Sequence, residues 1–123
     1  MKILVVAVGK VKDKPMRACV DEYALRIARY AKVQEIELAD DDEATVAARF
    51  ERAIPERARR IALEVDGTRV TSAGLAKLVE RAQNDAVPAL AFLVGGSYGL
   101  PKVTSAGAHQ RLSLSDLTLP HRL

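Results

Sequence analysis

Hydrophobic positions along this chain form two patterns, continuous runs and strict alternation, separated by stretches of helical spacing. Residues 3–8 (ILVVAV) and 89–94 (ALAFLV) are apolar throughout, which is typical of strands buried on both faces of a sheet. Residues 33–38 (VQEIEL) mix apolar and polar side chains, with alternation from Glu35 to Leu38, and predict a half-exposed strand. Residues 61–65 (IALEV) predict a further strand, which we expect to end at the Asp-Gly turn pair that follows.

Helical patterns lie between these runs. Pro15 and Pro101 suit the first turn of a helix, and Thr71 or Ser72 can cap one. Pro55 is expected to end a helix that carries apolar residues at helical spacing. The sequence therefore predicts helices over residues 15–30, 46–54, 72–82 and 101–110.

Strands and helices alternate from the first residue to the last part of the chain. Two strands are too apolar to face water, so the sequence predicts an α/β protein with a mostly parallel sheet and helices on both faces. With 123 residues and no linker or repeat, we expect a single domain over residues 1–123.

Composition narrows the class of protein only slightly. The single cysteine, Cys19, excludes an internal disulfide and suits a reducing cytoplasm. No apolar run has the length of a membrane helix, and the two histidines with one cysteine indicate no metal cluster. The net charge is +3, and the acidic run at residues 40–43 precedes a predicted helix, where negative charge offsets the helix dipole.

Two glycines follow the apolar run of residues 89–94. Gly95 and Gly96 lie at the carboxyl end of a predicted strand, where doubly wound sheets bind ligands. We expect them to permit positive φ and to let a ligand approach the backbone amides, with Gly99 freeing the turn into the next helix. The spacing matches neither the dinucleotide fingerprint nor a Walker A loop, and a plain tight connection is the alternative.

The last part of the chain alternates leucines with hydroxyl residues. This pattern predicts a short strand from Leu112 that passes into an ordered loop. Leu117 and Leu119 would form apolar walls, and Ser115 and Thr118 a polar rim, as an adenine ring requires. An edge strand with a polar outer face is the alternative interpretation.

Four motifs occur in the order VVAVGK, DEYALR, FLVGGSYGL and LSLSDLTLPH. Together they resemble, over the whole chain, the small knotted methyltransferases of the SPOUT superfamily that modify a pseudouridine in large-subunit ribosomal RNA. The resemblance implies a trefoil knot, a homodimer, S-adenosylmethionine as cofactor and methylation at N3 of the base. It places the cofactor at Leu63, Gly96, Ser115, Asp116, Leu117, Thr118, Leu119 and Pro120, with Gly95 keeping the turn open.

Methyl transfer to a ring nitrogen is an in-line displacement that depends on alignment, and the imide nitrogen must lose its proton. His121, beside the predicted cofactor loop, is the candidate general base, with Asp116 as an alternative and no role for His109. The basic residues near the first strand are candidate contacts to rRNA phosphates: Lys10, Lys12, Lys14 and Arg17.

Members of the resembled family continue past the PH-x-L motif with a further helix and tail, whereas this sequence ends at Leu123. We therefore expect a C-terminal truncation, an interrupted gene or a shortened natural relative, and in each case the closure of the knot is in question. The competing functional hypothesis is a non-catalytic α/β relative with at most weak nucleoside binding. A nicotinamide-dependent Rossmann enzyme is disfavoured, because no glycine fingerprint follows the first strand.

Overall fold

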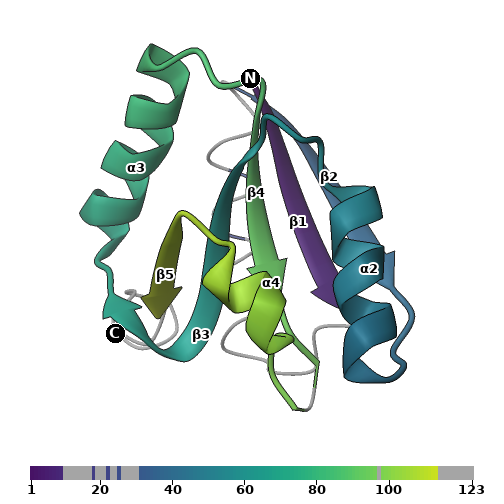
Figure 1. Cartoon of the computed structure of the whole chain (residues 1–123). Helices are drawn as coiled ribbons and strands as arrows, with labels where there is room; N and C mark the ends of the chain where they lie inside the picture. Colours follow the sequence, from purple (N-terminus) through teal and green to yellow (C-terminus); the bar gives the residue numbers. More distant parts are fainter. Residues whose placement is uncertain (10–17, 19–21, 23–24, 26–30, 97, 114–123) are drawn as a thin grey trace.

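The computed structural model describes residues 1–9, 18, 22, 25, 31–96 and 98–113. These residues contain a five-stranded sheet flanked by helices (Figure 1). The strands are β1 (Lys2–Val8), β2 (Lys32–Leu38), β3 (Arg59–Arg69), β4 (Ala89–Val94) and β5 (Gln110–Ser113). The helices with described bounds are α2 (Glu43–Ala53), α3 (Ser72–Asn84) and α4 (Lys102–Ala106).

The sheet has the strand order β2-β1-β4-β3-β5, and every pair is parallel. The predicted fold class is therefore confirmed, with a wholly parallel sheet in the described part of the chain. The two central strands, β1 and β4, are the two continuous apolar runs of the sequence. Residues 3–8 of β1 and all of β4 are buried. In β2, Val33, Ile36 and Leu38 are half-buried and the other residues are exposed, which confirms the predicted half-exposed strand.

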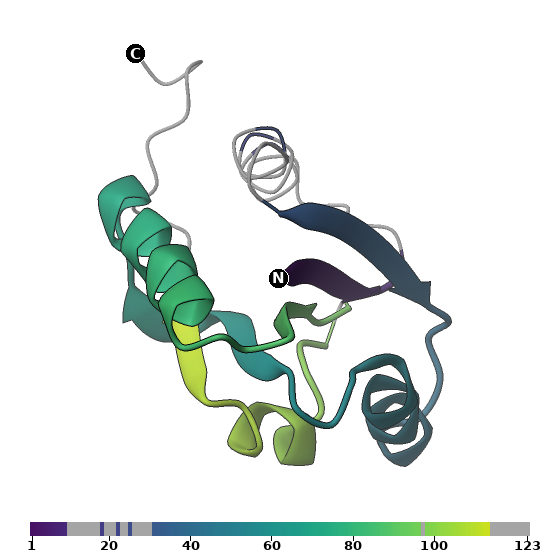
Figure 2. The ribbon, with the colours of Figure 1, turned by 90° about the horizontal axis from the view of Figure 1, so that it is seen from above.

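Side chains alternate between two apolar layers because successive residues of a strand point to opposite faces. Figure 2 shows α3 on one side of the sheet and α2 with α4 on the other. On the α3 side, the buried residues of the central strands are Ile3, Val5, Ala7, Leu90, Phe92 and Val94. On the α2 side they are Leu4, Val6, Val8, Ala89, Ala91 and Leu93.

The helices α2 and α3 pack against the sheet through the apolar residues that recur at helical spacing in their sequences. In α3, Leu75 and Val79 are buried against the first layer, and in α2, Val46 and Phe50 are buried against the second. Full burial of one such side chain stabilises the fold by about 1.5–3 kcal/mol. The first predicted helix lies mostly outside the described residues, although Ala18 packs against the α3 side of the core.

The third strand is longer than predicted. β3 continues through Asp66 and Gly67 to Arg69, so the prediction of a turn there was wrong. The reason is pairing with β5: Leu112 is in register with both Leu63 and Thr68, and the register shifts between these two residues of β3. A Cβ on Gly67 would lie 2.7 Å from the backbone of Leu112. This glycine therefore allows β3 and β5 to approach each other closely and does not form a turn.

The fourth helix is shorter than predicted. α4 ends at Ala106, and the N–H of Gly107 donates back to the carbonyl of Val103, whereas the sequence predicted a helix to Gln110. Instead, His109 pairs with β3: its N–H donates to the Arg60 carbonyl over 2.8 Å, and its Nδ1 accepts from the Arg60 N–H over 3.0 Å. This long-range pairing turns the chain into β5, which starts at Gln110 and not at Leu112.

Helix caps follow the sequence signals. Thr71 accepts from the N–H of Gly74 over 3.0 Å at the start of α3, and Asp42 accepts from the N–H of Thr45 over 2.8 Å at the start of α2. The Thr45 backbone N–H, ahead of the Thr45 hydroxyl and the charge of Arg49, lowers the pKa of Asp42 below its ordinary value of 3.8. No helix in the described ranges is long and apolar enough to cross a membrane.

The lowered pKa of Asp42 predicts a contribution to acid stability. A depressed carboxyl pKa adds stability above the unfolded-state value of 3.8, and this stability is lost as pH falls through the lowered pKa. The Asp42→Asn substitution keeps a capping oxygen but removes the charge. Urea unfolding between about pH 6 and pH 2 should therefore show a flatter acid limb for Asp42→Asn than for the wild type. Superimposable acid limbs would contradict this role of the carboxylate.

The carboxyl edge of the sheet as a candidate functional site

All five strands end at the same edge because they are parallel. At this edge Leu63 of β3 is in register with Val94 of β4 on one side and with Leu112 of β5 on the other. Gly95 follows Val94 directly, so the structure places Leu63 beside the start of the glycine turn. Leu63, the start of the glycine turn and the end of β5 therefore lie side by side on neighbouring strands. The sequence assigned Leu63, this turn and the residues that follow β5 to a cofactor site.

The remaining predicted site residues lie outside the described residues. This holds for the predicted cofactor residues 115–120, for His121, and for the basic residues Lys10, Lys12, Lys14 and Arg17. The described chain reaches Ser113, the end of β5 and two residues before Ser115. The assignments of these residues therefore stay predictions.

The glycine turn is shaped mainly by its own backbone. Positive φ occurs at Gly99 (81°) and not at Gly95 or Gly96, so the expectation for these two residues was wrong. A Cβ on Gly95 would lie 2.3 Å from the carbonyl carbon of Gly99, and the N–H of Gly99 donates to the carbonyl of Gly96 over 3.0 Å. Gly95 is thus required by the turn itself. At Gly99 no atom of the described residues lies within 4 Å of an added Cβ, so the described part of the chain leaves the outer side of the turn open.

An ion-pair cluster that the sequence analysis missed connects three elements at this edge. Glu64 Oε2 accepts from Ser105 Oγ of α4 over 2.8 Å and from Arg111 Nε of β5 over 2.6 Å. Arg111 also donates to Asp66 Oδ1 over 3.1 Å. The hydrogen bond to Glu64, followed by the charges of Glu64 and Asp66, raises the pKa of Arg111. The only signal in the sequence was an acid inside the apolar run IALEV.

A cleft of about 420 Å³ lies on the other side of the glycine turn, between the ends of β1 and β4. Its floor and walls include Val8, Val46, Gly96 and Leu100. One wall is the loop from β2 to α2, which carries the acidic residues Asp40, Asp41, Asp42 and Glu43. The other wall is the segment from Tyr98 to Lys102.

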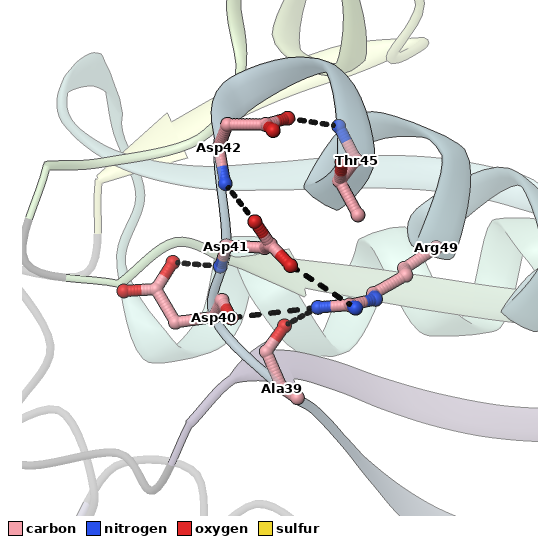
Figure 3. A network of polar contacts seen from close by, with 6 residues as sticks. All are labelled: Ala39, Asp40, Asp41, Asp42, Thr45 and Arg49. Carbon is pink, nitrogen blue, oxygen red and sulfur yellow. Dashed lines mark hydrogen bonds and ion pairs between the residues drawn. The ribbon is translucent and has the colours of Figure 1, made fainter.

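The acidic loop is held by its own hydrogen bonds (Figure 3). Asp40 Oδ1 accepts from the N–H of Asp41, and Asp41 Oδ1 accepts from the N–H of Asp42. Arg49 of α2 donates to the carbonyl of Ala39 over 2.7 Å and pairs with Asp41 over 3.4 Å. This arrangement agrees with the interpretation that these acids stabilise the start of a helix. Among the described residues, no group of three or more His, Cys, Asp or Glu is arranged to hold a metal ion.

The residues at the carboxyl edge fit a nucleoside cofactor in two respects. Leu63 and the glycine turn lie next to each other, and the open outer side of the turn leaves its backbone free for approach. The strand that leads to the predicted adenine loop ends beside them. Ligands of doubly wound sheets bind at this edge because loops diverge there.

The packing of Gly95 predicts a strong effect of an added methyl group. Gly95→Ala would place Cβ against the Gly99 backbone, which has no side-chain freedom to move away, and should lower the free energy of unfolding by about 3 kcal/mol. Gly107→Ala is the matched control, since its nearest atom is 3.3 Å away and its φ is −81°. Chemical denaturation measures the free energy of unfolding of both variants. Equally small losses in the two would show that the backbone of the turn can move to accept the methyl group.

Glu64 and Asp66 form a matched pair for testing the ion-pair cluster. The side chain of Glu64 is 15% exposed, whereas that of Asp66 is 79% exposed. Neutralising a part-buried carboxylate that accepts from two partners should cost more, so we expect Glu64→Gln to lower the free energy of unfolding by about 1–2 kcal/mol. Asp66→Asn should cost less than about 0.5 kcal/mol because water screens its contact. Denaturant titration measures the free energy of unfolding of both variants. Equal losses would refute the larger contribution expected of Glu64.

Comparisons with known proteins agree with this architecture. A family model described as "Predicted SPOUT methyltransferase" matches residues 1–123. The "Ribosomal RNA large subunit methyltransferase H" of Sorangium cellulosum is 48% identical over 123 residues, which cover 100% of this chain and 84% of that protein. Proteins of the same name from Geobacter metallireducens and Clostridium botulinum (strain Hall) are 33% and 32% identical, again over 100% of this chain and over 84% and 86% of theirs.

The match of the family model over the whole chain and the parallel α/β sheet confirm the resemblance that the four sequence motifs carried. This chain belongs to the SPOUT methyltransferase family.

Proposed function

We propose that this protein methylates N3 of a pseudouridine in large-subunit ribosomal RNA, with S-adenosylmethionine as the methyl donor. Family membership and the names of its relatives support the reaction class and the RNA. The observation that supports the proposal for this chain is the register of Leu63 with Val94 and Leu112, which brings Leu63, the start of the glycine turn and the end of β5 to one edge. The protein would act in the cytoplasm, on the ribosome, as a homodimer.

The proposed reaction depends on positioning. The cofactor supplies a methyl group on a sulfonium sulfur, which needs no metal for activation. Leu63, the glycine turn and residues 115–120 would hold the cofactor, and the ion-pair cluster of Glu64 would fix β5, from which that loop emerges. His121, or alternatively Asp116, would accept the proton of the imide nitrogen. Lys10, Lys12, Lys14 and Arg17 would contact rRNA phosphates.

The alternative is a non-catalytic relative that keeps the core and binds nucleosides weakly. It retains the same sheet and the same glycine turn, so the fold does not separate the two hypotheses. Cofactor affinity separates them, because a methyltransferase must bind its donor, whereas a protein that keeps only the core need not.

Titration calorimetry on the full chain tests the proposal. We expect S-adenosylmethionine to bind with one site per chain, and adenosine to bind more weakly because it lacks the amino-acid part. Methylation of ribosomes that lack the modification should then label the large-subunit rRNA. A folded chain that binds no S-adenosylmethionine and labels no ribosomes would support the non-catalytic alternative.

The two candidate bases are distinguished by substitution. If His121 is the base, His121→Ala should lower kcat by about 10²–10⁴-fold and leave the dissociation constant of S-adenosylmethionine nearly unchanged. Asp116→Asn should then retain most of the activity. The reverse result would assign the proton transfer to Asp116, and two fully active variants would exclude both.

A further inference from the structure

Tyr98 is the most exposed large hydrophobic side chain that the structure describes. Its side chain is 98% exposed, whereas both phenylalanines of the chain, Phe50 and Phe92, are buried at 0% and 7%. An aromatic ring left in water gains nothing for the fold, because ring burial is what stabilises a core. Val65 is similarly exposed, at 94%, but Tyr98 also lines a cleft, where its ring can contact a bound ligand.

The segment that carries Tyr98 is well held. Gly96 and Gly99 form an antiparallel bridge around it, and the Gly95 backbone packs against that of Gly99. Pro101 is buried after it, and the N–H of Lys102 donates to Glu43 Oε1 over 2.9 Å, which connects this segment to the start of α2. The ring thus projects from a turn that is fixed at both ends, so a partner that stacks on it would not have to order the turn first.

Tyr98 lies on the rim of the cleft between β1 and β4, and the topology makes this the natural ligand site of the sheet. In the order β2-β1-β4-β3-β5, the chain leaving β1 continues to β2 on one side, while the chain leaving β4 continues to β5 on the other. Connections diverge at such a switch point and leave a crevice beyond the strand ends. Val8 at the end of β1 and Gly96 after β4 both line the cleft.

The chemistry of the cleft suits a base better than a phosphate. The floor is apolar at Val8, Val46 and Leu100, and one wall carries four carboxylates that repel phosphate groups. The carboxylate of Asp40, which accepts one hydrogen bond through Oδ1, can accept from an imide or amino N–H, and Lys102 on the opposite wall can donate. A volume of about 420 Å³ accommodates a single nucleoside.

We propose that this cleft receives an unstacked base of the RNA substrate and that the ring of Tyr98 is the platform on which the base stacks. Bases splayed out of RNA loops commonly stack on aromatic side chains, and this contact tolerates any base. The proposal rests on the proposed function, because it takes RNA as the substrate. Gly96 lies between this cleft and the cofactor proposed on the β3 side of the turn, so the stacked base would be a neighbour of the methylated base and would hold the RNA in position.

Kinetics of three variants test the platform. Tyr98→Ala should lower kcat/KM for ribosomal RNA by about 10- to 100-fold, since stacking on one ring contributes that much. Tyr98→Phe keeps the ring and should stay within about twofold of the wild type. Val103→Ala, which removes another exposed apolar side chain (69%) outside the cleft lining, is the control and should have no effect. The affinity for S-adenosylmethionine should be unchanged in all three.

A fluorescence experiment tests the same contact without catalysis. The chain has no tryptophan, so Tyr98→Trp places a single indole on the turn. A uridine-containing single-stranded oligonucleotide should quench this indole, whereas its duplex should not, because its bases are already stacked. In a Val103→Trp variant the same oligonucleotide should leave the emission unchanged.

The outcomes separate the inference from the proposed function. If the wild type methylates RNA and Tyr98→Ala does so equally well, the platform is refuted while the function stands. If the wild type neither binds S-adenosylmethionine nor methylates RNA, the function is refuted, and quenching specific to Tyr98→Trp would still support a base-binding cleft. Equal quenching in both tryptophan variants, or none in either, would overturn the inference.

Discussion

Burial of β1 and β4 on both faces is the constraint on which the rest of this structure depends. These two adjacent strands expose almost no side chain to water, so helices must cover the sheet on both sides. Parallel strands need a crossover between each pair, and the crossovers bring all five strand ends to one edge. The candidate site at the carboxyl edge follows from this arrangement, because the loops that leave the strands meet there.

The edge is stabilised by polar contacts as well as by the core. Glu64 connects β3, α4 and β5, while Glu43 connects α2 to the start of α4. Both sides of the glycine turn are therefore anchored to neighbouring elements. Methyl transfer needs donor and acceptor in alignment, and anchored walls reduce the ordering that binding would otherwise require. A turn anchored in this way would hold a bound cofactor in one position.

Much of the fold could be predicted from the chain because local patterns and burial agree. The apolar runs at β1 and β4, the mixed apolar and polar positions of β2 and the cap Thr71 each have a local signal that the structure confirms. The errors arose where distant residues decide the outcome. Gly67 looks like a turn residue but lies in β3 against Leu112, and the pairing of His109 with Arg60 directs residues beyond α4 into β5.

The sequence by itself determined the fold class, the family and the types of residue at the site, because hydrophobic periodicity and motif spacing are properties of neighbouring positions. Only the tertiary structure decided which residues meet at the carboxyl edge. Leu63 comes to lie beside Val94 through strand pairing, and Glu64 meets Ser105 and Arg111 from positions more than 40 residues away. The exposure of Tyr98 was likewise decided by the tertiary structure, because burial of a ring depends on what packs around it and not on its neighbours in the chain.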